Sequence, residues 1–190
     1  MKTREAWLVA AAEHLNNLIG ETGTLEPNRS VLVSVGWPRR DQNGRVVGQC
    51  TSNGDHERKP HIFVAPTQTE PTEVLCILLH ELIHAADWCQ HGHKGPFRRT
   101  WKAVGFTGKP TECTPGEQLR QQLEAIAIDA LGHYPHEEIA GRGGDEPPPQ
   151  KARMLKLQCP GCGYIIRATR LWIETGLPTC ACGCLFDPEG

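Results

Sequence analysis

The sequence predicts an α+β fold followed by a small cysteine-rich unit, and three observations support this prediction. Apolar residues at helical spacing near the N-terminus precede short segments that alternate like strands, and longer apolar segments of helical character follow them. A stretch whose only apolar residues are prolines then leads to a cluster of cysteines. With 190 residues, 38% hydrophobic and 22% charged, the chain can form one globular domain and an appendage.

The first part of the chain is expected to form one helix and three strands. Apolar side chains recur at helical spacing over residues 5–19. The segment 30–37 places three valines on one face, and the segments 45–50 and 61–65 have the composition of two further strands. Because residues 51–58 between the last two are rich in turn formers, we expect a hairpin or a meander there.

Three helices are predicted to follow. Residues 74–89 form an almost wholly apolar segment, so this helix is expected to be buried. Its N-terminus can be capped by Thr69 or Thr72. Two further helices are expected over residues 96–104 and 116–131, each with an apolar stripe on one side.

A domain boundary is predicted after the last of these helices. Residues 141–150 have no apolar side chain other than proline, so they cannot pack into a core. We expect a flexible linker over residues 141–152. It would separate a domain of residues 1–140 from a cysteine-rich unit of residues 153–190.

Charge and hydropathy indicate the compartment. The chain has 20 basic and 22 acidic residues and a formal net charge of -2, so its overall charge does not point to a polyanionic partner. No apolar run approaches the ~20 residues that span a bilayer. Glu5 and Glu13 interrupt the N-terminal segment, which therefore differs from a secretory signal. We expect a cytoplasmic protein without a membrane partner.

The buried helix carries a motif with its own chemistry, His-Glu-x-x-His. His80 and His84 are separated by one helical turn and project from the same face, so their ring nitrogens can converge on one zinc ion. Glu81 is placed to reach a water on that ion and to act as a general base in peptide hydrolysis. The competing interpretation, three polar side chains buried in a core without a metal, is energetically costly.

A third ligand has to come from outside this helix. A glutamate further along the chain, Glu117 or Glu124, is one candidate. The stronger candidate is His93, because the short loop before the helix that begins at Pro96 could fold it back over the metal. His91 in the same loop is its nearest rival.

Two other polar residues are candidates for supporting roles. Tyr134 could donate a hydrogen bond to an oxyanion, although packing at a helix end is the more common role of such a tyrosine. Asp87 could orient a ligand histidine, or it could cap the helix or be solvated.

The C-terminal cysteines predict a second zinc site. Cys159 and Cys162 form a Cys-Pro-Gly-Cys-Gly turn, and a second turn contains Cys180, Cys182 and Cys184. Two such turns separated by a short β-hairpin make a zinc ribbon, and a segment this short depends on the metal to fold. Because Cys182-Gly repeats Cys162-Gly, we expect Cys180 and Cys182 to complete the site and Cys184 to be spare.

The run HELIHAADWCQHGHKGPFRRTWKAVGFTGK resembles the SprT-like zinc metallopeptidases, the Spartan-type family, and in particular its short bacterial and phage-type members. The resemblance extends over most of residues 28–136. In the family pattern a third histidine stands four residues before an aromatic that opens the next helix, as His93 and Phe97 do here. This resemblance implies a minimal zincin-like domain: an N-terminal helix, a small and mainly antiparallel sheet, the active-site helix and further helices, with a C-terminal zinc ribbon.

The resemblance also implies an activity, metal-dependent endoproteolysis of proteins that are bound or crosslinked to DNA. One catalytic and one structural zinc ion are then expected, with Glu81 as the general base. DNA, single-stranded or duplex, could contact the ribbon through its aromatic and basic side chains, namely Tyr164, Arg167, Arg170 and Trp172. The alternative is a non-catalytic zinc-ribbon adaptor that binds DNA or a protein in repair or transcription.

Overall fold

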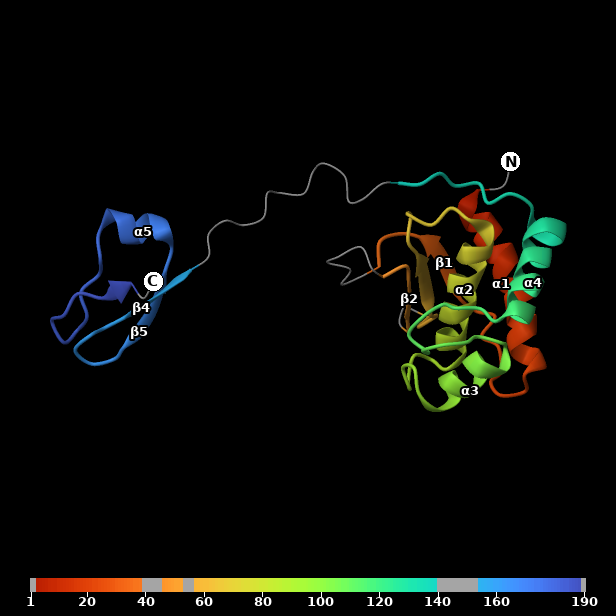
Figure 1. Cartoon of the computed structure of the whole chain (residues 1–190), viewed down its shortest axis with the longest axis horizontal. Helices are drawn as coiled ribbons and strands as arrows, with labels where there is room; N and C mark the ends of the chain where they lie inside the picture. The colour runs from red at the N-terminus through yellow and green to blue at the C-terminus, as the bar shows by residue number, and fades with distance from the viewer. Residues whose placement is uncertain (1–2, 39–45, 53–56, 140–153, 189–190) are drawn as a thin grey trace. The chain divides into compact units, whose positions relative to one another are not determined.

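A computed structural model describes residues 3–38, 46–52, 57–139 and 154–188, and the chain divides into two compact units, Met1–Gly141 and Arg142–Gly190 (Figure 1). Both units are small mixtures of helices and short sheets, so the chain has an α+β fold. The linker predicted over residues 141–152 lies outside the described residues. None of the helices in the described segments is long and apolar enough to cross a membrane.

The first unit begins with α1 (Arg4–Glu21), which covers the predicted helix. The side chain of Thr3 caps it by accepting a hydrogen bond from the N–H of Ala6 at 3.1 Å. The stripe that includes Trp7, Leu8 and Leu15 is fully buried against the rest of the unit.

The sheet of this unit consists of β1 (Leu32–Val35), β2 (Gly48–Thr51) and β3 (His61–Val64), in the order β1-β3-β2. β2 and β3 pair antiparallel, in agreement with the expected hairpin, whereas β1 and β3 pair parallel. The sheet is therefore mixed, which corrects the mainly antiparallel sheet that the resemblance implied. The chain reverses direction twice between β1 and β3, so the two strands run the same way and pair in parallel.

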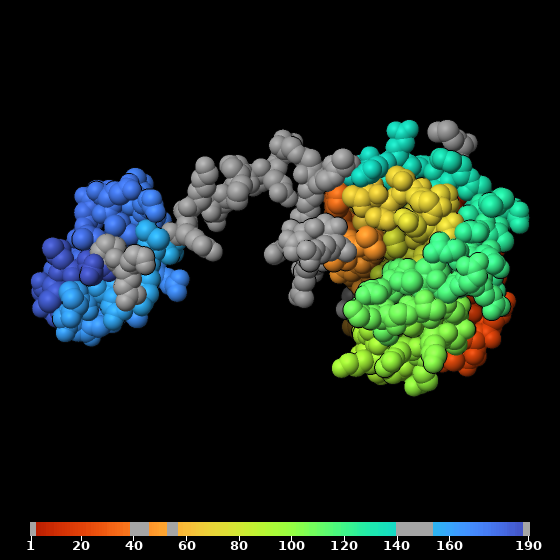
Figure 2. Space-filling view, in the orientation of Figure 1, coloured from red at the N-terminus to blue at the C-terminus, as the bar shows by residue number. Residues whose placement is uncertain are grey.

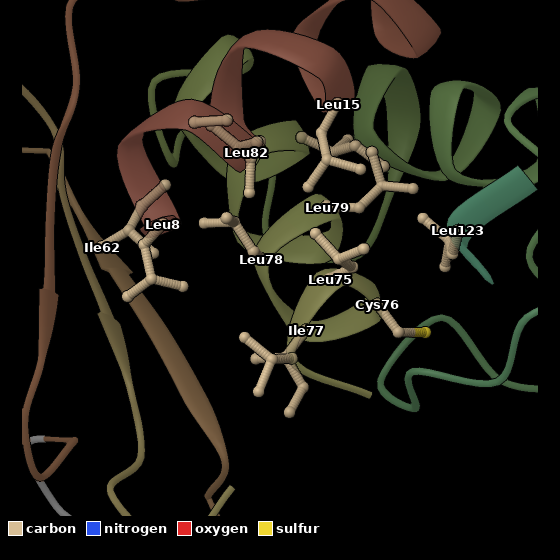
Figure 3. Close-up of a cluster of buried hydrophobic side chains, with 14 of the residues drawn as sticks. Leu8, Leu15, Ile62, Leu75, Cys76, Ile77, Leu78, Leu79, Leu82 and Leu123 are labelled. Carbon is tan, nitrogen blue, oxygen red and sulfur yellow. The ribbon is translucent and has the colours of Figure 1, made fainter. Parts of the chain in front are cut away.

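The central element is α2 (Pro71–Ala86), which contacts the sheet, α1, α3 and α4 (Figure 1). Its cap is Glu70 rather than either threonine: the carboxylate accepts hydrogen bonds from the N–H groups of Thr72 and Glu73. A carboxylate has two oxygens and can satisfy two free helix donors, whereas a threonine hydroxyl satisfies one. Figure 3 shows leucines of α2 between Ile62 of the sheet and Leu123 of α4.

Three shorter helices complete the unit: α3 (Gly95–Ala103), α4 (Glu117–Ala125) and the π-helical turn η1 (Ile126–Leu131). The predicted helix 116–131 thus changes its hydrogen-bonding pattern over its last six residues. Leu119, Leu123 and Ala127 nevertheless face the core as expected.

The second unit contains β4 (Leu155–Gln158), β5 (Ile165–Ala168), α5 (Arg170–Thr175) and β6 (Asp187–Pro188), with the antiparallel sheet order β5-β4-β6. The hairpin formed by β4 and β5 encloses the first cysteine turn. The hairpin predicted between the two cysteine turns is wrong, because that interval contains a single strand, β5, followed by α5. Thr169 has the extended backbone of a helix cap, and its carbonyl accepts hydrogen bonds from Trp172 and Ile173, so the helix begins there.

Candidate metal centre

Three histidines converge at the surface of α2. His80 and His84 lie on successive turns of α2, and His93 reaches them from the loop between α2 and α3. The Nε2 atom of His93 is 3.2 Å from Nε2 of His80 and 3.2 Å from Nε2 of His84. Their donor atoms all lie within 4.8 Å of one another, so the three side chains could hold a metal ion. The group joins the two helical residues to one loop residue, as the sequence predicted.

The loop that delivers His93 is held by Asp87, the residue that caps the C-terminal end of α2. Its buried carboxylate accepts hydrogen bonds from the backbone N–H of His91 at 2.9 Å and from Nδ1 of His91 at 2.8 Å. His91 is therefore bound to Asp87, and His93, not His91, joins the pair on α2. Asp87 therefore caps the helix and shapes the loop. The histidine that its carboxylate contacts is His91, which is not one of the three converging histidines.

The other candidates from the sequence do not join this group. Among the described residues, only these histidines and one set of cysteines bring three or more potential donors together. Glu117 and Glu124 are exposed on α4, and the Glu117 carboxylate accepts a hydrogen bond from Gln121. Tyr134 is buried against Trp7, with ring centroids 4.8 Å apart, so it has the packing role.

Phe97 contacts all three histidines and was not assigned this role from the sequence. Its ring stacks on His84 with centroids 4.1 Å apart, and it meets the rings of His80 and His93 edge-on at 5.1 Å each. Phe97 is fully buried in the first turn of α3. One apolar side chain therefore fixes the orientation of all three imidazoles. In the sequence, Phe97 was notable only for its spacing from His93 in the family pattern. Its packing against the three rings could not be predicted from that spacing.

Burial keeps these imidazoles uncharged at neutral pH. Loss of hydration and, to a lesser extent, the neighbouring histidines lower the pKa of His80 to about 4 and that of His84 to about 3. Burial also lowers the pKa of His93. A neutral imidazole has a free lone pair, so the group presents the form that binds metal ions.

Glu81 lies beneath β2, close to this group in the chain. Burial and, to a lesser extent, the nearby Cys89 raise its pKa to about 8, against the opposing effect of a hydrogen bond from the backbone N–H of Cys50. β2 passes so close that a Cβ on Gly48 would lie 2.9 Å from Oε1 of Glu81 and 2.6 Å from Cγ2 of Ile77. Only glycine fits at position 48. In the sequence, the only indication that β2 passes so close to α2 was this glycine inside a predicted strand.

The second group consists of Cys159, Cys162, Cys180 and Cys182, whose sulfur atoms also lie within 4.8 Å of one another. Sγ of Cys159 is 3.3 Å from that of Cys182, and Sγ of Cys162 is 3.5 Å from that of Cys180. Cys184 is not a member of this group, although its thiol contacts those of Cys182 and Cys159. These are the four cysteines that the sequence selected.

The two cysteine turns have related backbone geometry. Gly163 and Gly183 follow the second cysteine of each turn with φ of 75° and 91°, and their N–H groups bond to the carbonyls of Cys159 and Cys180. Cys159 N–H bonds to the carbonyl of Tyr164, five residues on, and Cys180 N–H to that of Cys184, four residues on. The second turn is therefore the first turn shortened by one residue, which explains how a Cys-x-Cys spacing can replace Cys-x-x-Cys.

No family model, curated protein or solved structure matches this chain.

Proposed function

We propose that the chain is a zinc-dependent metalloendopeptidase, with zinc held by His80, His84 and His93. The convergence of the three Nε2 atoms is the observation that carries the proposal. Two nitrogens bound to a tetrahedral zinc at about 2.0–2.1 Å lie roughly 3.3 Å apart, and the two distances to His93 Nε2 are 3.2 Å. Three protein ligands leave a fourth position for water, which is the arrangement of catalytic rather than structural sites.

We propose Glu81 as the general base, because it directly follows His80 in the chain and its carboxylate is buried beneath β2. Bound zinc would polarise the substrate carbonyl and acidify a water molecule. The Glu81 carboxylate takes the proton from the attacking water and returns it to the leaving amine. Its raised pKa favours holding that proton between the two steps. The N–H of Cys50 and the close backbone at Gly48 keep the carboxylate in place during both.

A second zinc ion, with a structural role, is proposed at Cys159, Cys162, Cys180 and Cys182. Four thiolates close the coordination sphere and leave no position for water. Backbone N–H groups of Cys162 and Gly161 face Sγ of Cys159 and lower its pKa to about 6, which favours the thiolate that binds zinc.

We propose DNA-bound proteins as the substrates, in keeping with the resemblance to SprT-like peptidases. α3 begins beside His93 and lies at the surface of its unit (Figure 2). Residues 94–102 contain no acidic residue, and four of them are exposed cations: Lys94, Arg98, Arg99 and Lys102. In the second unit Tyr164 and Trp172 are 62% and 66% exposed, so both rings are free to stack on bases.

The proposal is tested with the zinc-loaded chain and a DNA-binding protein, with and without single-stranded DNA. We expect cleavage of the DNA-bound protein, and we expect Glu81→Gln to abolish it while both zinc ions remain bound. Cleavage by this variant at the parent rate would contradict the mechanism. The alternative, a non-catalytic adaptor, is favoured by the exposed ribbon aromatics but gives Glu81 no role. It predicts DNA binding without cleavage by the zinc-loaded parent.

A further inference from the structure

Two cysteines outside both metal-binding groups lie in contact with each other. Cys50 is in β2 and Cys89 is in the loop after α2, and their sulfur atoms are 3.4 Å apart. Both side chains are partly exposed, so a small oxidant can reach them. The other two cysteines of this unit are arranged differently, because Sγ of Cys76 donates to the backbone carbonyl of Cys113 at 3.2 Å.

The backbone holds both cysteines in position. Cys50 is paired with Ile62 in the ladder between β2 and β3. Trp88 and Cys89 adopt left-handed conformations with φ of 52° and 56°, which non-glycine residues rarely do. The N–H of Cys89 bonds to the carbonyl of His84 at 2.8 Å, which fixes this strained turn. The backbone on each side therefore holds the two sulfurs in contact.

We propose that Cys50 and Cys89 form a reversible disulfide that ties β2 to the loop carrying His93. To reach the bond length of about 2.05 Å, the sulfurs have to approach by roughly 1.4 Å from their separation of 3.4 Å. Rotation of the two side chains and a small shift of the loop have to supply a movement of this size.

The reaction with a small disulfide such as oxidised glutathione is balanced. The thiolate of one cysteine attacks the glutathione disulfide, forms a mixed disulfide and releases one glutathione thiolate. The second cysteine, after losing its proton, displaces the second glutathione and closes the Cys50–Cys89 bond. The two cysteine sulfurs are oxidised, two glutathione molecules are formed, and they take up the two protons.

A metal ion is a poorer explanation for this pair. Two thiols provide two donors, and neither cysteine belongs to a group of three or more potential donors among the described residues. The disulfide needs no third group.

The bond would join two elements that shape the metal centre. β2 covers Glu81 through Gly48 and Cys50, and the loop after α2 presents His93. In the oxidised chain the loop could no longer move away from β2. This inference concerns thiol chemistry and does not depend on the proposed peptidase activity.

The whole zinc-loaded chain is equilibrated with glutathione buffers of increasing oxidised fraction, its free thiols are blocked, and a non-reduced digest is analysed by mass spectrometry. We expect a peptide pair linked through Cys50 and Cys89, which disappears on addition of dithiothreitol. The matched control Cys76→Ser/Cys113→Ser retains the link. Separate glutathione adducts on Cys50 and Cys89, or two unreacted thiols in a strongly oxidising buffer, would overturn the proposal.

Amide hydrogen exchange tests whether the Cys50–Cys89 disulfide restrains the loop that carries His93. We expect residues 87–94 to exchange several-fold more slowly in the oxidised chain than in the reduced one. In Cys50→Ser the two buffers should give the same exchange rates. Equal exchange in oxidised and reduced parent, with the link present, would show that the loop is not held by it.

Discussion

The three-histidine group and the four-cysteine group differ in the amount of buried apolar structure around them. The histidines lie on a core that joins α1, the sheet, α2, α3 and α4. In the second unit, the buried core consists of Leu157, Cys159, Cys180 and Phe186, so two of its four members are themselves potential ligands. The three histidines thus lie on a unit whose apolar core exists without them. In the second unit, by contrast, two of the four potential ligand cysteines are themselves half of the core.

This difference separates two uses of a metal ion. A fold with its own core can hold three imidazoles in place before a metal binds, and it can leave one coordination position open. A unit with so few buried side chains gains its folding free energy largely from the metal.

Removal of zinc is expected to have the largest effect, and only in the second unit. Metal binding to such four-cysteine sites supplies about 10 kcal/mol or more of apparent free energy at neutral pH. A strong chelator should therefore unfold residues 154–188 and leave the first unit folded. Two-dimensional NMR with dithiothreitol present distinguishes the two sets of amide signals. Retained dispersion in the second unit would show that its apolar side chains suffice.

Truncation of Phe97 is expected to weaken both the first unit and its histidine group. Phe97→Ala removes a fully buried ring and should destabilise the unit by about 3–5 kcal/mol, since Phe97 is 0% exposed. Phe106→Ala is the matched control, because Phe106 is also buried but its ring is 6.3 Å from that of His80. Denaturant unfolding and metal titration should show a similar loss of stability in both variants and a larger loss of metal affinity in the first.

Glu81 should contribute stability to the metal-free first unit at low pH, and this contribution should be lost as the pH rises. Its folded pKa of about 8 lies above the ordinary glutamate pKa of 4.5. Between these values the folded state binds more protons than the unfolded state, so the free energy of unfolding falls with pH. Glu81→Gln removes this contribution, and its stability relative to the parent should increase from pH 5 to pH 8 by on the order of 1–3 kcal/mol.

Zinc provides the control for this pH effect. A bound cation favours the charged carboxylate, so the difference in slope between parent and variant should shrink in the zinc-loaded protein. The histidines titrate in both proteins and cancel in the comparison. A pH-independent difference between the metal-free proteins would show that Glu81 is not held protonated by burial.

The smallest effect is expected for Cys184→Ser. Cys184 is outside the four cysteines whose sulfur atoms converge, whereas Cys182 is one of them. Zinc affinity of the second unit should stay within a few-fold of the parent in Cys184→Ser and fall strongly in Cys182→Ser. Competition with a chromophoric chelator measures both. Equal losses in the two variants would mean that Cys184 shares the site.

The sequence by itself determined the local features of this protein. Helical periodicity predicted α1 and α2, and the i, i+4 spacing placed His80 and His84 on one face, since both depend only on the repeat of a helix. The spacing of glycines and cysteines likewise selected the four cysteines that converge. The chemistry proposed for Glu81 came from the same local motif.

Only the tertiary structure decided the contacts between segments far apart in the chain. The sequence left His91 and His93 open, and the hydrogen bonds of Asp87 to His91 were needed to separate them. It gave no sign that β1 would pair in parallel with β3, that Phe97 would contact three imidazoles, or that Cys50 would meet Cys89. Residue spacing specifies neighbours along one helix or turn, whereas these contacts follow from how complete elements pack to bury their apolar faces.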